Sequence, residues 1–224
     1  MDKTLLVLIP AYNASSTILE LIEKTSKLVH KSDIVVIDDG SKDQTFAIAQ
    51  KVGAAVLKHP INRGKGEALK TGFKFAIEKN YHAVLTMDAD LQHDPSSIND
   101  FLQKSNENFS GIIIGTREIS LKKMPFARWL TNNLTSVILS ILSGQRIRDS
   151  QSGYRLISTQ ILKRIKLKAR KYDLESEILA KAGRHGFKID SVPIRTIYRG
   201  SRSFINPFVD TGRFIKLMWT SLWW

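Results

Sequence analysis

The sequence predicts an α/β protein with a mostly parallel central sheet that is flanked by helices. Short aliphatic and β-branched runs alternate with segments of helical period through the first half of the chain. Strands that read as continuous apolar runs belong in a parallel sheet that is buried on both faces. The expected strands are Leu5–Ile9, Asp33–Ile37, Ala83–Met87, Ile112–Gly115 and Lys188–Pro193, and the expected helices of the first half are Ser15–Lys31, Asp43–Val52 and Lys65–Lys79. Ligands of such sheets bind at the carboxyl ends of the strands, where the polar residues of the first three strands fall.

The size and composition of the chain limit its organisation. With 224 residues, 42% of them hydrophobic, it can bury one substantial core but is too short for two domains of ordinary size, so we expect a single domain over residues 1–224. It contains no cysteine, so a metal must be bound by oxygen or imidazole, and a reducing compartment is favoured. The apolar run from Leu5 to Ile9 ends at Pro10 and predicts a first strand rather than a signal peptide.

The net charge of +13 is concentrated in one half of the chain. Residues 1–119 carry 14 basic and 15 acidic side chains, whereas residues 120–224 carry 20 and 6. This excess favours a polyanionic partner, such as nucleic acid, an anionic membrane surface or a phosphorylated substrate, although a solvated basic face would also account for it. The sequence has no aromatic platform or helix-turn-helix pattern for nucleic acid, so we expect no nucleic-acid partner.

Two amphipathic segments in the second half are candidates for contact with a membrane surface. Residues 125–142 are apolar on one side but include Arg128 and two asparagines, which makes the segment too polar to cross a bilayer. Residues 208–224 place tryptophans beside Arg213 and Lys216, a combination that suits the headgroup region. Either segment could instead pack on the core of the domain.

Two carboxylates separated by one residue are the strongest local signal. Asp88 and Asp90 follow directly on an expected strand, so both can reach the ligand crevice. Paired carboxylates repel each other and need a cation, and together with phosphate oxygens they offer the ligands that Mg²⁺ or Mn²⁺ accepts. Gln92 and His93 are close enough in the chain to complete the shell. An Asp-x-Asp triplet in a solvated turn is common by chance, and the position after a strand is what favours a metal site.

Polar residues also follow the other two early strands. Asp38 and Asp39 precede a glycine, and their carboxylates can accept hydrogen bonds from a base or ribose, or cap the next helix. Pro10-Ala11-Tyr12-Asn13 offers an aromatic ring and an amide beside the same crevice. The basic, glycine-rich stretch at residues 62–68 begins a helix and resembles a phosphate contact made by backbone amides, but it matches neither a P-loop nor a dinucleotide fingerprint.

Taken in order, six motifs resemble those of the family-2 glycosyltransferases, and most closely those of the dolichyl-phosphate mannose synthase group. They are Pro10-Ala11-Tyr12-Asn13, Asp38-Asp39-Gly40-Ser41, Asn62-Arg63-Gly64-Lys65-Gly66, Asp88 to Pro95, Gly115-Thr116-Arg117 and Asp149 to Arg155. The resemblance covers nearly the whole chain and is specific as an ordered series. It implies the GT-A fold, a Rossmann-like nucleotide-diphospho-sugar transferase fold. It also implies inverting transfer of a sugar from a nucleotide-sugar donor such as GDP-mannose or a UDP-sugar, with Mg²⁺ or Mn²⁺ as cofactor.

The resemblance further implies roles for individual residues. The nucleotide-sugar would contact Pro10, Ala11, Tyr12, Asn13, Asp38, Asp39, Lys65, Asp88, Ala89 and Asp90. The metal would be held by Asp88, Asp90 and Gln92. The acceptor would be bound by Arg117, Arg128, Arg155, Ser201 and Arg202, and the catalytic residues would be Asp90, Arg117, Asp149 and Arg202.

The chemistry of the acceptor separates two versions of this function. An alcohol needs a general base to remove its proton, whereas a phosphate monoester is already an anion and needs only cations to orient it. We favour a polyprenyl or dolichyl phosphate, with the enzyme held at the inner, cytoplasmic face of the membrane by its amphipathic segments or by a membrane-anchoring subunit. The alternative is a saccharide or glycolipid hydroxyl in cell-surface polysaccharide synthesis, with Glu175 or Glu177 as the base. Asp149 could be catalytic or could fix Arg155 or the loop backbone. A non-catalytic anion-binding module is the alternative of another class, and it would not need the paired aspartates.

Overall fold

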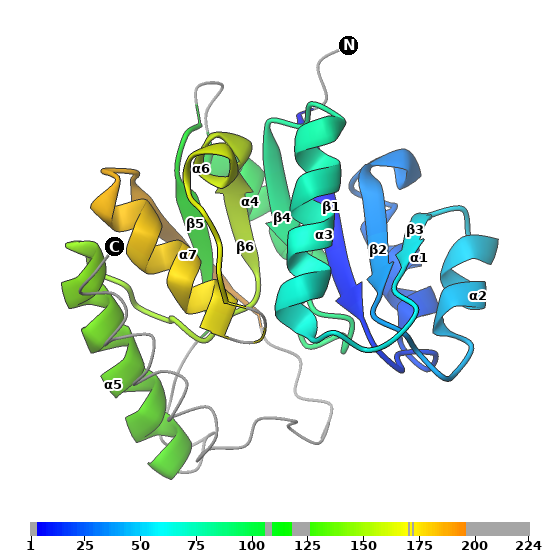
Figure 1. Cartoon of the computed structure of the whole chain (residues 1–224), viewed down its shortest axis with the longest axis horizontal. Helices are drawn as coiled ribbons and strands as arrows, with labels where there is room; N and C mark the ends of the chain where they lie inside the picture. Colours follow the sequence, from blue (N-terminus) through cyan, green and yellow to red (C-terminus); the bar gives the residue numbers. More distant parts are fainter. Residues whose placement is uncertain (1–3, 106–108, 118–125, 170, 172, 196–224) are drawn as a thin grey trace.

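The computed structural model describes residues 4–105, 109–117, 126–169, 171 and 173–195, with the backbone alone described for residues 126–130. Within these residues seven strands form one sheet in the order β3-β2-β1-β4-β6-β5-β7 (Figure 1). The strands are β1 (Leu5–Ala11), β2 (Ile34–Asp38), β3 (Ala55–Lys58), β4 (Ala83–Thr86), β5 (Ile112–Arg117), β6 (Arg155–Ser158) and β7 (Ile189–Ile194). β6 is antiparallel to both of its neighbours, and the other paired strands are parallel.

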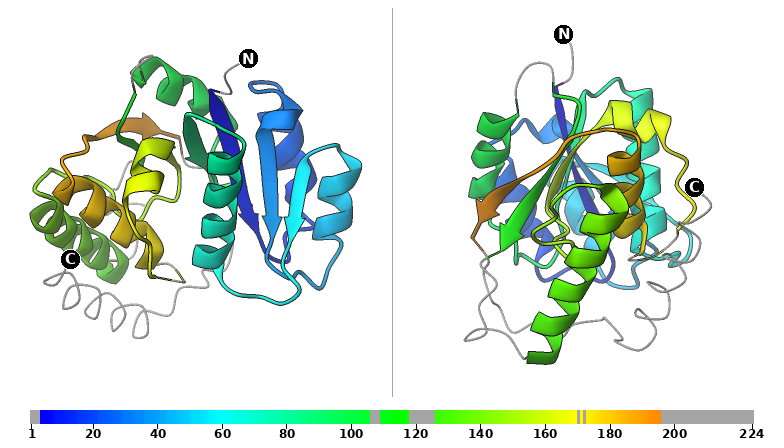
Figure 2. Two further views of the ribbon diagram at one scale, coloured as in Figure 1. Left: turned by 45° about the horizontal axis from the view of Figure 1, so that its top comes forward. Right: turned by 90° about the vertical axis from the view of Figure 1, so that its left-hand side faces the viewer.

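Helices cover both faces of the sheet. They are α1 (Ile18–Thr25), α2 (Thr45–Lys51), α3 (Lys65–Glu78), α4 (Ile98–Lys104), α5 (Phe126–Ser143), α6 (Thr159–Arg164) and α7 (Asp173–Arg184). Along β1, Leu6 and Leu8 belong to the core shared with α3, α6 and α7, whereas Val7 and Ile9 belong to the core shared with α1 and α4. The right-hand view of Figure 2 shows the two helix layers on opposite sides of the sheet. The α/β fold with a mostly parallel sheet buried on both faces is therefore confirmed.

The central strand β1 is longer than expected and contains a proline. It continues through Pro10, opposite Ile37 of β2, to Ala11. A proline lacks the N–H that a central strand normally donates. It is accommodated here because the pairing of β1 with β4 ends at Leu8, opposite Thr86, so the neighbour on that side has already ended.

Two strands and one helix boundary differ from the expectation. β3 was not predicted, because it has four residues, ends in a lysine and lies half-buried at the edge of the sheet. β6 was not predicted either, because it has four residues and begins with Arg155, a side chain that usually marks a surface. The helix expected over Ser15–Lys31 is shorter, since α1 covers Ile18–Thr25 and a 3₁₀ turn occupies Lys31–Asp33.

The direction of β6 determines which loops meet. Because β6 is antiparallel to β4, its first residue, Arg155, lies opposite Thr86, the last residue of β4. The segment that leads into β6 therefore lies next to the residues that follow β4. The ends of β1, β2, β4 and β5 and the start of β6 share this carboxyl edge of the sheet.

Candidate active site

The loops after β1 and β2 are fastened to each other at this edge. The side-chain oxygen of Asn13 accepts a hydrogen bond from the backbone N–H of Lys42 (2.9 Å), and the backbone N–H of Asn13 donates to Ser41 Oγ (2.9 Å). Asn13 has a φ of 50°, a left-handed conformation that asparagine tolerates better than most residues. Beside it, the Tyr12 ring is 45% exposed. An aromatic surface that can stack on a base is thus held in a fixed loop.

Asp38 closes the turn after β2 and retains an unused acceptor. Its Oδ1 accepts a hydrogen bond from the backbone N–H of Ser41 (3.1 Å), while its Oδ2 is buried and has no partner among the described residues. The turn continues through Gly40, which has a φ of 73° and where an added Cβ would lie 2.5 Å from the backbone of Ile61, so only glycine fits. A buried acceptor without a partner is costly, and a ligand N–H or hydroxyl would satisfy it.

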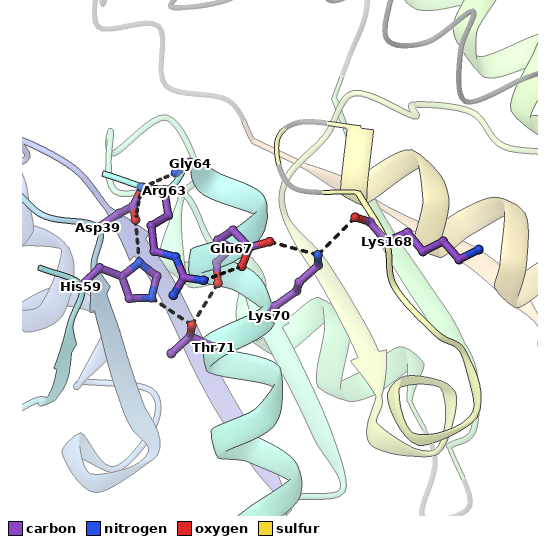
Figure 3. A network of polar contacts seen from close by, with 8 residues as sticks. All are labelled: Asp39, His59, Arg63, Gly64, Glu67, Lys70, Thr71 and Lys168. Carbon is purple, nitrogen blue, oxygen red and sulfur yellow. Dashed lines mark hydrogen bonds and ion pairs between the residues drawn. The ribbon is translucent and has the colours of Figure 1, made fainter. Parts of the chain in front are cut away.

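Asp39 also turns inward and holds the loop that precedes α3. Its carboxylate is hydrogen-bonded to His59 Nδ1 (2.6 Å) and to the backbone N–H groups of Arg63 (3.0 Å) and Gly64 (2.7 Å), as Figure 3 shows. The residue is only 3% exposed. Asp39 therefore holds the loop before α3 in place, a role that the sequence did not predict.

Lys65, the first residue of α3, contacts two acidic residues from later parts of the chain. Its Nζ lies 2.6 Å from Asp88 Oδ1 and 3.4 Å from Glu175 Oε1. A Cβ at Gly153 would lie 2.7 Å from Asp88 Oδ2 and 2.9 Å from Lys65 Nζ, so a residue without a side chain allows this close approach. Burial alone would raise the pKa of Asp88, but the Lys65 ammonium outweighs it, and the pKa is held below its usual value.

The pKa of Asp90, the second aspartate of the pair, is shifted in the opposite direction. Burial raises the pKa of Asp90, and the Asp88 carboxylate raises it further. Asp90 Oδ1 accepts the backbone N–H of Gln92 (3.0 Å). His93 is buried, which lowers its pKa; its Nδ1 accepts the backbone N–H of Asp88 (3.3 Å) and its ring stacks on Tyr154. Ala89, between the aspartates, is buried as well.

The described residues do not by themselves form a complete metal site. No three His, Asp or Glu side chains within them are arranged to hold a metal ion. Asp88 and Asp90 are two carboxylates that repel each other, which is the electrostatic situation that a cation would relieve. The pair fits a divalent ion that takes its remaining ligands from a bound diphosphate and water.

Arg117, at the end of β5, is held by a buried carboxylate. Its Nε lies 2.8 Å from Asp149 Oδ2 and its Nη2 2.9 Å from Asp149 Oδ1, a bidentate arrangement. Asp149 is 1% exposed and also accepts the backbone N–H groups of Arg117 and Gln151. Asp149 thus fixes Arg117 and the loop backbone; the second role was considered from the sequence, whereas the Arg155 guanidinium bonds to carbonyl oxygens instead. The positive charge of Arg117 lowers the pKa of Asp88 and of His93. The Arg117–Asp149 pair therefore lies within electrostatic reach of the paired aspartates.

Arg155 is placed differently from the acceptor-binding role expected for it. Its side chain is 1% exposed and donates to the carbonyl oxygens of Ser152 (2.7 Å), Glu175 (2.6 Å) and Ser150 (2.7 Å). These bonds use all three guanidinium nitrogens, and they join the segment before β6 to α7. We therefore do not include Arg155 among the residues that meet an acceptor.

The two glutamates considered as bases have different surroundings. Glu177 is buried and accepts the backbone N–H groups of Lys168 and Ala169 and the ammonium of Lys181 (2.6 Å), so it anchors the loop before α7. Glu175 instead faces the site, with its Oε1 buried, close to Lys65 and without a hydrogen bond in the described part of the chain. Of the two, Glu175 is the one placed for chemistry.

One face of α5 is polar and buried, and the other is apolar and exposed. Ser136 faces Ser150 (3.0 Å) in the interior. On the outer face Leu134, Val137 and Ile141 are 58%, 56% and 75% exposed, and we call these three residues the α5 stripe. None of the described helices is long and apolar enough to cross a membrane. The Arg128 side chain, Ser201, Arg202 and the segment 208–224 lie outside the described side chains, so their expected roles stay predictions.

One site residue and one contact escaped the sequence reasoning. The residue is His59, which had no evident partner in the sequence because β3, the strand that delivers it to Asp39, was not recognised. The contact is the one between Lys65 and Glu175, which joins residues 110 positions apart and left no local signal. Both of these residues had been named as candidates, but not as neighbours.

Known proteins resemble this chain in sequence and in fold. The sequence model of the family described as "Glycosyl transferase family 2" matches residues 6–166. A protein of Methanococcus voltae named UDP-N-acetylglucosamine–dolichyl-phosphate N-acetylglucosaminyltransferase is 33% identical over 220 residues, covering 88% of this chain and 87% of the relative. The polyprenol monophosphomannose synthase of Mycolicibacterium smegmatis is 27% identical over 201 residues, covering 84% and 76%. The crystal structure of glucosyl-3-phosphoglycerate synthase from Mycobacterium tuberculosis with Mn²⁺, UDP and glucosyl-3-phosphoglycerate has a TM-score of 0.74 at 22% identity, over 98% of this chain and 78% of that one.

Proposed function

Because the chain belongs to glycosyl transferase family 2 and has the GT-A fold, we propose that it moves a sugar, with inversion, from a nucleoside diphosphate to a polyprenyl or dolichyl phosphate. One observation carries the proposal. Lys65, Asp88 and Asp90 gather at the carboxyl edge of the sheet, within electrostatic reach of the Arg117–Asp149 pair. A donor diphosphate and an anionic acceptor are both negatively charged, so each needs a cationic partner at this edge.

The donor would occupy the crevice after β1, β2 and β4. The exposed Tyr12 ring would stack on the base, and the unpartnered Asp38 Oδ2 would accept a hydrogen bond from base or ribose. Lys65, at the start of α3, would exchange part of its contact with Asp88 for the diphosphate. Each of these groups is already fixed in place, so little conformational entropy would be lost on binding.

Asp88 and Asp90, with Gln92 close by, would hold a divalent ion against the diphosphate. Two carboxylates and an amide leave room for phosphate oxygens and water in an octahedral shell of Mg²⁺ or Mn²⁺. Such an ion would offset the negative charge that grows on the leaving diphosphate. The residues of this chain would orient the diphosphate, with Lys65 adding a second positive charge near it.

A phosphate acceptor suits the arginine side of the site. The nucleophile would be a phosphate oxygen, which is ionised at neutral pH and needs no base. Arg117 would orient it, because Asp149 holds the guanidinium in one direction. The M. voltae and M. smegmatis relatives are named for dolichyl phosphate and polyprenol monophosphate chemistry, which supports a lipid phosphate for this chain.

A lipid acceptor requires the enzyme to reach a membrane surface. The α5 stripe would lie in the interfacial region, and the basic second half of the chain would be attracted to anionic headgroups. We propose attachment to the cytoplasmic face of a membrane by these features, with or without a further membrane-anchoring subunit.

The alternative acceptor, a saccharide or glycolipid hydroxyl, is favoured by one observation. Glu175 places a buried carboxylate oxygen without a hydrogen bond in the described part of the site. A hydroxyl acceptor would donate its proton to that oxygen. Against this, the same Oε1 lies 3.4 Å from the Lys65 ammonium, so an acceptor hydroxyl would have to share this oxygen with a cation.

The test is transfer of radiolabelled sugar from a panel of GDP- and UDP-sugars, with Mg²⁺ or Mn²⁺, to a short polyprenyl phosphate and to the matching polyprenol. Label in the phosphate alone is expected and would identify the donor. Asp90→Ala should abolish transfer, whereas Asp33→Asn, just before the start of β2 and so at the opposite edge of the sheet, should not. Transfer to the polyprenol or to a sugar hydroxyl, lost in Glu175→Gln, would establish the alternative. Full activity of Asp90→Ala would contradict the metal site.

A further inference from the structure

We propose that His59 is a positioning residue of the donor site. Its ring is hydrogen-bonded through both nitrogens and holds the Asp39 carboxylate, and Asp39 in turn sets the start of α3, which carries Lys65 to Asp88. The inference rests on the proposed function, because the site concerned is the one that would bind the nucleoside diphosphate.

His59 is enclosed between the end of β2 and the second turn of α3. Its Nδ1 lies 2.6 Å from Asp39 Oδ1 and its Nε2 lies 2.9 Å from Thr71 Oγ1 (Figure 3). The backbone N–H of His59 donates to the carbonyl oxygen of Asp38 (2.8 Å), which fixes the origin of the side chain. The ring is only 5% exposed, so water does not compete for these bonds.

Both nitrogens of the ring have a hydrogen-bond partner. Nδ1 contacts Asp39 Oδ1, a carboxylate oxygen that also accepts the backbone N–H of Arg63. Nε2 contacts Thr71 Oγ1, which also lies 3.0 Å from the carbonyl oxygen of Glu67 one turn earlier. The ring is therefore held from both sides.

The cationic side chains near this contact have other partners. The side chains of Arg63 and Lys70 both pair with the Glu67 carboxylate, as Figure 3 shows. The ammonium of Lys58, on β3, lies over the Phe46 ring. The side chain that contacts the buried Asp39 carboxylate is that of His59.

Asp39 transmits the position of the ring to the phosphate side of the site. Its Oδ1 and Oδ2 accept the N–H groups of Arg63 and Gly64, the two residues that precede α3. Lys65 follows at once, and its ammonium reaches Asp88 Oδ1 at 2.6 Å. A shift of Asp39 would move the first residue of α3, and the lysine would no longer be aimed at the diphosphate position.

Two substitutions separate the two bonds of the ring. His59→Asn keeps an amide N–H near the position of Nδ1, toward Asp39, and loses the bond to Thr71. His59→Gln keeps an N–H near the position of Nε2, toward Thr71, and loses the bond to Asp39. Positioning through Asp39 therefore predicts that the asparagine variant preserves nucleotide binding and the glutamine variant does not.

A matched control removes a similar bond at the other end of the strands. The hydroxyl of Tyr81, a buried residue just before β4, donates to the Asp33 carboxylate (2.9 Å). Tyr81→Phe therefore loses a hydrogen bond to an aspartate far from the carboxyl edge. It should reduce the free energy of unfolding without changing nucleotide affinity.

The experiment is isothermal titration of the full chain with UDP and with GDP in the presence of Mn²⁺. We expect His59→Gln to weaken binding about tenfold or more, His59→Asn by less than about threefold, and Tyr81→Phe not at all.

Each result has a distinct meaning. Equal affinity of the wild-type and His59→Gln chains would overturn the positioning role, as would losses of affinity that follow the loss of stability in all three variants. A wild-type chain that binds neither nucleotide would overturn the proposed function itself, and the positioning proposal with it.

Discussion

Replacing Asp149 by asparagine tests whether Arg117 needs its buried partner to act on an acceptor. The carboxylate makes two charge-assisted bonds to the guanidinium, at 2.8 and 2.9 Å, and both would be lost or weakened. Removing one member of a buried ion pair costs about 3–5 kcal/mol. Arg117 is 21% exposed and can gain water, so we expect the lower end of that range, about 3 kcal/mol, divided between folding and acceptor binding.

The assay is steady-state transfer with donor and acceptor varied separately, together with urea unfolding. For Asp149→Asn, KM for the phosphate acceptor should rise about tenfold, which corresponds to about 1.4 kcal/mol, and the free energy of unfolding should fall by the remainder, about 1.6 kcal/mol. KM for the donor should stay within about threefold of wild type.

The control for Asp149 is Asp190→Asn. Asp190 pairs with Lys104 and Lys188 on the surface of β7, where ion pairs contribute at most about 1 kcal/mol. This variant should keep both KM values. An unchanged acceptor KM in Asp149→Asn, despite the loss of stability, would refute the view that Asp149 acts through Arg117 on the acceptor.

Four further predictions follow from the same structure. Glu177→Gln should lower the free energy of unfolding by about 2 kcal/mol, because it weakens bonds to two backbone N–H groups and an ammonium, yet leave transfer rates intact; a large loss of kcat in a stable variant would make it a base after all. The pKa of Asp90 is raised, so as the pH falls this carboxylate takes up a proton before an ordinary aspartate does. In that pH range Mn²⁺ binding should weaken, and each Mn²⁺ ion that binds should release protons. Calorimetry in buffers of different ionisation enthalpy measures the released protons, and their absence would count against Asp90 as a ligand. Serine at all three positions of the α5 stripe should reduce sedimentation with anionic vesicles by about tenfold or more without loss of stability; unchanged sedimentation would mean that another surface meets the membrane. Gly153→Ala should fold normally, because the added methyl group would meet only the ends of the Asp88 and Lys65 side chains. It should separate the Lys65–Asp88 pair and so weaken Mn²⁺-dependent nucleotide binding. Wild-type affinity would show that nucleotide binding does not need the close contact between Lys65 and Asp88.

The parts of the fold that were predictable are those with long apolar runs. The central strands β1, β2 and β4 were identified because parallel strands buried on both faces need uninterrupted apolar sequence. β6 could not be recognised, because a four-residue strand that starts with Arg155 carries almost no pattern. Its antiparallel direction depends on packing between β4 and β5, which no local signal reports.

The same limit applied to the site. Asp88, Asp90 and Arg117 could be named, because each follows a strand or belongs to a recognisable motif. The burial of Arg155 could not be foreseen, because it depends on three carbonyl oxygens from two separate segments. The sequence therefore predicted which elements supply the site better than which side chains face it.

The insertion of β6 explains how a donor half and an acceptor half come to share one site. The electrically balanced first half of the chain supplies the crevice after β1, β2 and β4, and the basic second half contains the segment that leads to β6. Because β6 runs antiparallel beside β4, Gly153 is brought against Asp88 and Lys65, and Asp149 is brought to Arg117. A parallel strand at that position would enter the sheet from the opposite edge and would take this segment away from the aspartates. The reversal of one short strand thus supplies the carboxylate that holds Arg117, the arginine that would orient an acceptor phosphate, within electrostatic reach of the aspartates that would hold the donor.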